Sequence, residues 1–289
     1  MGKLDFSGQL DFSGQVAIVT GGSRGIGRAI AEAFMGAGAD VVVCARKDPG
    51  ADAPPDTTSG APVNDAPPND VSVNDAQANK HKAVFIQADV RDPDQVKRLV
   101  DETTDRFGRL DILINNAGGS PSVAAADASP RFVRSVIELN LLAPFFCAQA
   151  ANSVMQSQPG GGVIVNIGSV SGSRPSPGTA AYGAAKAALV SLTSTLAVEW
   201  APKVRVNCVI GGLIATEEAE SHYGGADGLA AVASSVPMAR MGTPEDIAGL
   251  CLVLASPLTS YVSGAALVAN GAGERPAYLE ALERHQTSR

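Results

Sequence analysis

The sequence predicts an α/β protein built on a doubly wound parallel sheet of seven strands, with helices on both faces. Short apolar runs rich in β-branched residues alternate with helical segments along most of the 289 residues. These runs are apolar throughout, which is typical of parallel strands buried on both faces. The first run also leads through a glycine-rich turn directly into a helix. Together these observations favour a βαβ arrangement.

The expected elements follow in a regular order along the chain. Strands are expected at 15–20, 40–46, 82–90, 110–118, a run from Val163 that ends at Ser169, 204–210 and 264–273. Helices are expected at 28–38, 93–108, 129–155, 179–200 and 244–256. Pro144 interrupts the long helix, where a kink is expected. Residues 211–238 mix small and polar side chains and are interpreted as a mobile flap.

The domain organisation is predicted to be a single domain over 14–273 with a tail at 274–289. Residues 47–80 are rich in Pro, Asp and Asn and are nearly free of large apolar side chains, so they are expected to be a mobile insertion within the domain. The hexapeptide LDFSGQ occurs twice, at 4–9 and 10–15, and residues 1–13 are expected to be a duplicated extension whose first copy is disordered.

Composition and charge exclude several functions. Hydrophobic residues make up 45% and charged residues 18%, which indicates a globular protein, and the net charge of −7 disfavours non-specific nucleic-acid binding. No apolar run has the length of a membrane span, and the amino terminus lacks an apolar signal core, so a cytoplasmic protein without membrane contact is expected. The four cysteines lie singly in apolar segments, which favours buried free thiols over disulfides or a metal site.

The glycine-rich turn GGSRGIG (21–27) is the first candidate site. Gly21, Gly25 and Gly27 permit a tight turn and the close approach of a pyrophosphate, whose charge the following helix amino terminus stabilises. An ordinary glycine-rich turn is the alternative interpretation. The position after a strand and before a helix favours dinucleotide binding.

The end of the second strand bears on cofactor choice. An acidic residue there would hold a free ribose and favour NAD, but the strand ends in Cys44, Ala45 and Arg46. Arg46 and Arg24 are predicted to bind a 2′-phosphate, which favours NADP. Two solvated surface arginines are the alternative. NAD also stays possible, because Asp48 or another aspartate of the insertion would replace the missing acid by folding back.

A third candidate site combines Ser169, Tyr182 and Lys186. Tyr182 and Lys186 are four residues apart in an Ala-rich helical segment, so they share one face of the helix. A neighbouring ammonium stabilises phenolate, so we expect the pKa of Tyr182 to be lowered and the phenol to act as a general acid and base. Ser169 would stand at the carboxyl end of a strand, where open α/β sheets bind ligands. A Tyr-x-x-x-Lys pair alone is more often a surface pair.

These motifs together resemble those of the short-chain dehydrogenase/reductase family over roughly residues 14 to 271. They are TGGSRGIG (20–27), Asp89–Val90, NNAG (115–118), Asn140, Ser169, YGAAK (182–186) and NCVIGGLIAT (207–216), in the family's order. The stretch 237–271 looks like the tail of the 3-oxoacyl-carrier-protein reductase branch. The resemblance implies a Rossmann-type fold and an oxidoreductase acting on CH–OH groups.

The resemblance also implies roles for individual residues. The catalytic residues would be Asn140, Ser169, Tyr182 and Lys186: Tyr182 as acid and base, Lys186 as its electrostatic partner and ribose ligand, Ser169 on the substrate oxygen, and Asn140 on a water in a proton relay. The cofactor contacts would be Gly21, Ser23, Arg24, Gly25, Ile26, Gly27, Arg46, Asp89, Val90, Asn115, Ala117, Gly118, Tyr182, Lys186, Gly212, Ile214 and Thr216.

Two departures from the family pattern stand out. Gly211–Gly212 replaces the usual Pro-Gly, which frees one φ angle before the flap. The segment from Arg46 to Asp89 is longer than usual and lacks a helical period.

The leading hypothesis is an NADP(H)-dependent oxidoreductase that interconverts a small-molecule ketone, of 3-oxoacyl or another type, and a secondary alcohol. The alternatives are an NAD-dependent secondary-alcohol dehydrogenase and a catalytically idle, cofactor-binding regulatory protein. The resemblance and the small residues of helix 179–200 favour a homotetramer.

Overall fold

The computed structural model describes residues 8, 10–47, 58–59, 83–217, 219 and 223–287. Most of the predicted insertion (47–80) and the first LDFSGQ copy, apart from Gly8, lie outside these residues, so their expected mobility and disorder stay predictions. The strands are β1 Val16–Thr20, β2 Asp40–Ala45, β3 Thr58–Ser59, β4 Ala83–Gln87, β5 Ile112–Asn115, β6 Gly162–Ser169, β7 Val204–Gly211 and β8 Ala266–Ala269. The helices are α1 Gly25–Gly36, α2 Pro93–Phe107, α3 Pro130–Ile137, α4 Ala143–Ser157, α5 Ala180–Trp200, α7 Ala226–Ser235, α8 Pro244–Ala255 and α9 Ala277–Thr287.

The strands form one parallel sheet in the order β3-β4-β2-β1-β5-β6-β7-β8. The seven predicted strands are all present, which confirms the predicted fold class. The two-residue strand β3 pairs with β4 as an additional edge strand. It comes from the segment interpreted as an insertion, so this part of the segment joins the sheet through backbone hydrogen bonds, which do not depend on apolar side chains.

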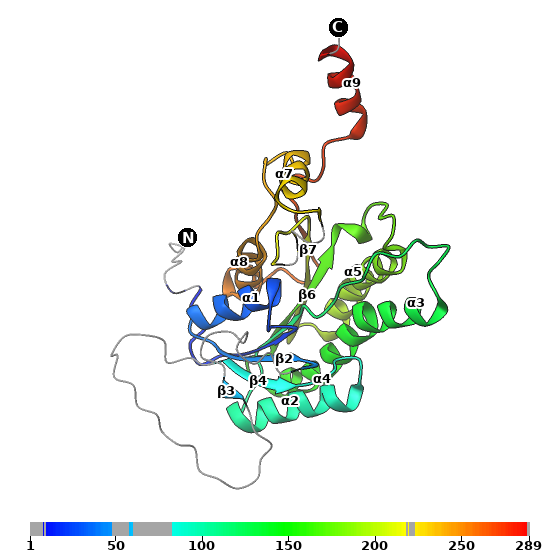
Figure 1. Ribbon diagram of the computed structural model, residues 1–289. Coiled ribbons are helices and arrows are strands. Elements are labelled where there is room, and N and C mark those ends of the chain that lie inside the picture. The colour runs from blue at the N-terminus through cyan, green and yellow to red at the C-terminus, as the bar shows by residue number, and fades with distance from the viewer. Residues whose placement is uncertain are drawn as a thin grey trace.

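Two apolar cores lie on opposite faces of the sheet. One is formed with α1 and α8, and the other with α2, α4 and α5 (Figure 1). Neighbouring strand residues alternate between them: Val41 and Val43 belong to the first core, and Val42 to the second. Burial on both faces is the reason that these strands are apolar throughout.

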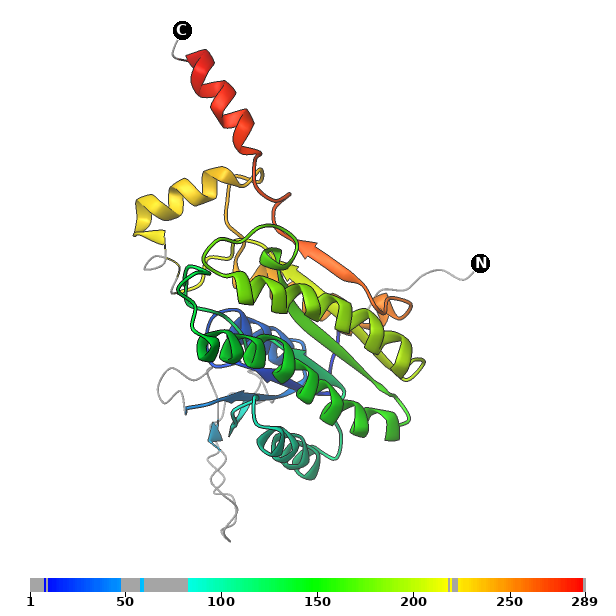
Figure 2. The same ribbon diagram turned by 90° about the vertical axis from the view of Figure 1, so that its right-hand side faces the viewer.

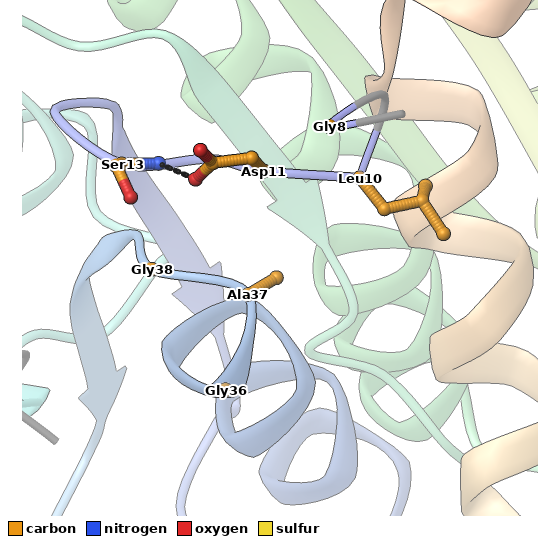
Figure 3. A pocket seen from close by; sticks show the side chains of 7 residues that line it. All are labelled: Gly8, Leu10, Asp11, Ser13, Gly36, Ala37 and Gly38. Atoms are coloured by element: carbon orange, nitrogen blue, oxygen red, sulfur yellow. Dashed lines mark hydrogen bonds between the residues drawn. The ribbon is translucent and has the colours of Figure 1, made fainter. Parts of the chain in front are cut away.

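The second LDFSGQ copy packs against helix α1. Phe12, in the second LDFSGQ copy, is completely buried and packs edge-to-face on Phe34 with 5.1 Å between ring centroids. A cavity of about 530 Å³ lies beside this copy; it is lined by Gly8, Leu10, Asp11, Ser13, Gly36, Ala37 and Gly38 (Figure 3). Because it adjoins the start of β1, it lies at the amino end of the strands, the end opposite to the predicted site.

The predicted long helix is divided into three parts. Between α3 and α4 lies one turn of π-helix, η2 (Glu138–Leu142). Pro144 lacks the N–H that would bond to the Asn140 carbonyl four residues earlier, which explains why the α-helical ladder is interrupted here. Single π-helical turns of this kind are frequent at functional sites.

The carboxyl-terminal part departs most from the sheet and its helices. The segment expected to be a flap contains α7, and the tail contains α9, which projects from the rest of the molecule in both views (Figures 1 and 2). Within the described part of the chain, α5 alone has the length and hydropathy of a membrane span. One face of this helix packs on β6 and β7, and Lys186 is buried there.

Candidate active site

The glycine turn between β1 and α1 is shaped by contacts that only glycine permits. Gly21 and Gly25 have φ angles of +64° and +52°. A Cβ on Gly27 would lie 2.3 Å from the Gly21 carbonyl oxygen and 2.4 Å from Asn116 Nδ2. The turn therefore keeps its backbone exposed at the amino end of α1, which is the arrangement that binds a pyrophosphate.

Thr20 and Asn116 hold this turn against the end of β5; both lie in motifs named in the sequence analysis, which assigned neither a role. Thr20 Oγ1 accepts hydrogen bonds from the N–H groups of Asn116 and Ala117, each at 3.0 Å. Asn116 Nδ2 donates to the carbonyl oxygens of Thr20 and Gly21 at 2.9 and 3.2 Å. The signal was present in the sequence, because Thr20 precedes the glycines and Asn116 follows a buried strand.

Some predicted cofactor residues lie on the glycine turn, and others approach it from other segments. Gly21, Ala117, Gly25 and Thr216 lie together: a Cβ on Gly21 would contact Ala117, and one on Gly25 would lie 3.5 Å from Thr216 Cγ2. The flap therefore reaches the turn. Ser23, Arg24 and Ile26 lie on the turn itself, with Arg24 exposed. Ile214 forms a bridge with Gly242, and Gly212 lies where a Cβ would be 2.7 Å from Asn270 Cα.

Three predicted cofactor residues have partners that sequence analysis did not foresee. The Val90 side chain is buried in the core with α2. Asp89 is paired with Arg91 at 2.5 Å, and this guanidinium lowers the pKa of the carboxyl. The Asn115 side chain is buried, and its Nδ2 donates to the Pro144 carbonyl and to Asn166 Oδ1; the cofactor contact expected of Asn115 stays a prediction.

The predicted catalytic residues come together at the carboxyl end of β6. The Ser169 hydroxyl lies close enough to the Tyr182 phenol to lower its pKa, and Lys186 Nζ lies 5.7 Å from the centre of the Tyr182 ring. Lys186 is almost fully buried and donates a 2.8 Å hydrogen bond to the Ile167 carbonyl. This bond fixes the ammonium beneath the ring. Its acceptor, Ile167, lies two residues before Ser169 on β6.

Asn140 and Gly118 complete the group. A Cβ on Gly118 would lie 2.8 Å from Asn140 Oδ1 and 3.3 Å from Lys186 Nζ, so both side chains meet at this glycine. Asn140 is fully buried; Oδ1 accepts from Gly119 N at 2.8 Å, and Nδ2 donates to the Gly119 and Val136 carbonyls, both at 2.9 Å. The π-helical turn thus presents a polar side chain to the loop after β5.

Burial dominates the electrostatics of the site. It raises the pKa of Tyr182, and the hydrogen bond with Ser169 only partly offsets this effect. It lowers the pKa of Lys186 to about 8. The expectation that Lys186 lowers the pKa of Tyr182 is therefore wrong for this structure, because the ammonium is directed to the Ile167 carbonyl and the phenol loses hydration.

This arrangement defines a class of protein: a doubly wound α/β protein with a dinucleotide cradle at the carboxyl ends of its strands and a Ser–Tyr–Lys group beside it. The glycine contacts fit a nicotinamide dinucleotide, whose pyrophosphate needs a backbone free of side chains. Comparisons with known proteins agree. The family described as enoyl-(acyl carrier protein) reductase matches residues 63–272.

Individual relatives have several activities. The 3-oxoacyl-[acyl-carrier-protein] reductase of Synechocystis sp. is 36% identical over 251 residues, covering 86% of this chain and 92% of that protein. The 3alpha-hydroxysteroid dehydrogenase of Mediterraneibacter gnavus is 33% identical over 258 residues, covering 89% and 96%. The crystal structure of a short-chain type dehydrogenase/reductase from Mycobacterium marinum is 33% identical, with a TM-score of 0.78 over 94% of this chain and all of that one. The chain belongs to the short-chain dehydrogenase/reductase family and is an NAD(P)-dependent oxidoreductase.

Proposed function

We propose that this protein is an NADP(H)-dependent oxidoreductase that interconverts a ketone and a secondary alcohol, with 3-oxoacyl-type carbonyls as the first candidates. The observation that carries the proposal is the grouping of the Ser169 hydroxyl and the Tyr182 phenol with the buried Lys186, which lies beside Gly118 and Asn140. A positioned hydroxyl, a phenol and an ammonium are the groups needed to hold a carbonyl oxygen and deliver a proton to it.

In the reductive direction Tyr182 donates its proton to the carbonyl oxygen, and Ser169 holds that oxygen by a hydrogen bond. A raised pKa keeps the phenol protonated at neutral pH, which suits an acid. The cofactor, when bound, supplies the hydride. The protein contributes position and charge.

Lys186 and Asn140 serve to restore the proton of Tyr182. Lys186 lies under the phenol ring and beside Gly118, where Asn140 also ends. Pro144 removes the usual helical donor to the Asn140 carbonyl, which leaves this oxygen suited to hold a water. A chain of phenol, ammonium and water would lead from the interior to solvent.

The preference for NADP rests on the end of β2. Arg46 is exposed there, and Arg24 is exposed in the glycine turn. The nearby Asp89 is neutralised by Arg91, so its carboxylate does not oppose a phosphate as a free acid would. A charge-assisted hydrogen bond from a guanidinium to a 2′-phosphate is worth about 1.5–3 kcal/mol, or roughly tenfold in affinity at the lower figure.

The test compares kcat/KM for NADPH and NADH in the wild type and in Arg46→Ala. The carbonyl panel contains acetoacetyl thioesters, diketones, quinones and steroid ketones, since the relatives include acyl and steroid enzymes. We expect a preference for NADPH that falls about tenfold in the variant. Arg106→Ala, on α2, is the control. A wild type that prefers NADH would instead identify an NAD-dependent secondary-alcohol dehydrogenase.

The assembly is proposed to be a cytoplasmic homotetramer. Helix α5 leaves Ala184 and Ala187 exposed on the face away from the sheet, and Val198 on the same helix is 80% exposed. Val268 is also exposed on the edge strand β8. Small and apolar residues on an outer helix and an open sheet edge support association with further copies.

A further inference from the structure

A chain of buried side-chain hydrogen bonds runs behind the site, and none of the proposed catalytic steps uses it. Asn115 Nδ2 donates to the Pro144 carbonyl at 3.0 Å and to Asn166 Oδ1 at 2.9 Å. Asn166 Nδ2 donates to Thr193 Oγ1 at 2.9 Å, and Thr193 Oγ1 donates to the Leu189 carbonyl at 2.8 Å. The three side chains are at most 2% exposed.

This chain connects the two helices that carry the proton-relay groups. Pro144 lies in the first turn of α4, directly after the π-helical turn that holds Asn140. Thr193 lies on α5, seven residues and therefore two turns after Lys186. Asn115 and Asn166 are register partners on the neighbouring strands β5 and β6. One polar chain thus fixes both helices to the same two strands.

We propose that Asn166 and Thr193 are positioning residues that set the placement of Lys186 relative to Asn140 and Tyr182. The inference rests on the proposed function for its kinetic consequence. Apolar packing alone lets a helix slide along a sheet with small losses, whereas a directional hydrogen bond between buried groups has a narrow range of good geometry. Losing one partner leaves the other buried and unpaired, so the chain acts as a unit.

The burial pattern supports a positioning role over a general contribution to stability. The cores on both faces of the sheet are filled mainly by apolar side chains, which would pack at Asn166 and Thr193 without needing partners. Among the described residues, Asn115 Oδ1 is a buried side-chain oxygen without a hydrogen-bond partner, so the chain contains one unsatisfied atom. This arrangement therefore contributes directional hydrogen bonds rather than additional free energy of burial.

Thr193→Val tests the proposal, with Thr103→Val as the matched control. Thr103 is equally buried and makes the same intrahelical bond, from Oγ1 to the Leu99 carbonyl at 2.7 Å, but it lies on α2 and outside the chain. For Thr193→Val we expect a loss in kcat of about tenfold, and Thr193→Ser should restore kcat. Thr103→Val should lower Tm similarly and keep kcat.

A readout without turnover uses the cofactor-free protein. The Lys186 ammonium is followed by NMR in protein labelled with ¹³C at lysine Cε, and its titration midpoint should move in Thr193→Val and stay in Thr103→Val. If Thr193→Val is insoluble, Asn166→Leu replaces it, since an aliphatic side chain of similar volume cannot donate to Thr193.

Three outcomes would overturn the proposal: an unchanged kcat in Thr193→Val, an equal loss in Thr103→Val, or a lower kcat with the Lys186 titration unmoved. A wild type without activity on any carbonyl would refute the proposed function instead, and the Lys186 titration would then still decide the positioning role.

Discussion

Burial shifts the pKa values of Tyr182 and Lys186 in opposite directions, and each shift favours the neutral form of the side chain. The pKa of Tyr182 is raised, and that of Lys186 falls to about 8. A neutral phenol is a proton donor. The proposed carbonyl reduction is therefore expected to be favoured near neutral pH, and the reverse alcohol oxidation in a more alkaline medium.

Tyr182→Phe should abolish nearly all turnover and keep cofactor binding, because it removes the transferable proton and little else. In the wild type, reductive kcat/KM should stay level through neutral pH, whereas oxidative kcat/KM should rise as pH rises toward the raised pKa of the phenol. Initial rates in both directions from pH 6 to 10 check this. Substantial activity in Tyr182→Phe would exclude the phenol as the acid.

Lys186→Met should stabilise the fold at pH 7 while removing activity. The folded-state pKa of Lys186 is about 8 against 10.5 for the free group, so the unfolded chain binds more protons between these values and wild-type stability rises with pH there. Below pH 8 the penalty for burying the charge is on the order of 3 kcal/mol, reduced by about 1 kcal/mol for the lost bond to Ile167.

Urea titrations at pH 7 and pH 10 measure this difference. The advantage of Lys186→Met should shrink between pH 8 and about 10.5. Lys97→Met is the control, since Lys97 is exposed on α2 and should show no comparable gain. A Lys186→Met variant that is less stable at pH 7 would contradict the burial penalty.

At the scale of elements, the turn before α1 is the most tightly constrained connection in the site. Gly27 approaches the Gly21 backbone so closely that any side chain must displace the turn. Gly36, at the other end of the same helix, has no atom within 4 Å of a built Cβ. Substituting the two glycines therefore distinguishes the effect of a steric clash in the turn from the effect of helix propensity.

Gly27→Ala should weaken cofactor binding by about tenfold or more and destabilise the fold by about 1–3 kcal/mol, because the clashing atom is a backbone carbonyl. Gly36→Ala should be neutral or stabilising by up to about 1 kcal/mol. Cofactor titration and thermal unfolding of both variants check this. Equal affinity in the two variants would show that the turn adjusts.

At the scale of the whole molecule, apolar side chains remain exposed on two outer surfaces. Val198 on α5 and Val268 on β8 are 80% and 57% exposed. Light scattering at micromolar concentration should give the mass of a tetramer. Val198→Glu and Val268→Glu should each reduce that mass, because a carboxylate would be buried in the interface. Lys97→Glu, on α2, should leave it unchanged, and a monomeric wild type would refute the assembly.

The sequence by itself determined the fold class, the glycine turn and the identity of the reactive side chains. β-branched runs predict buried strands, and spacings such as Tyr182 to Lys186 are local, so a helix carries them directly into geometry. The Thr243 cap of α8 was also predictable from sequence and is present as a capping box.

Only the tertiary structure decided where the polar side chains point and how they titrate. Asn115 and Asn116 are neighbours in sequence, yet one joins the buried chain to Thr193 and the other holds the glycine turn. Adjacent residues at a strand end face opposite sides, and the sequence does not state which side carries a partner. The raised pKa of Tyr182 likewise depends on hydration lost to residues distant in the chain, which no local spacing records.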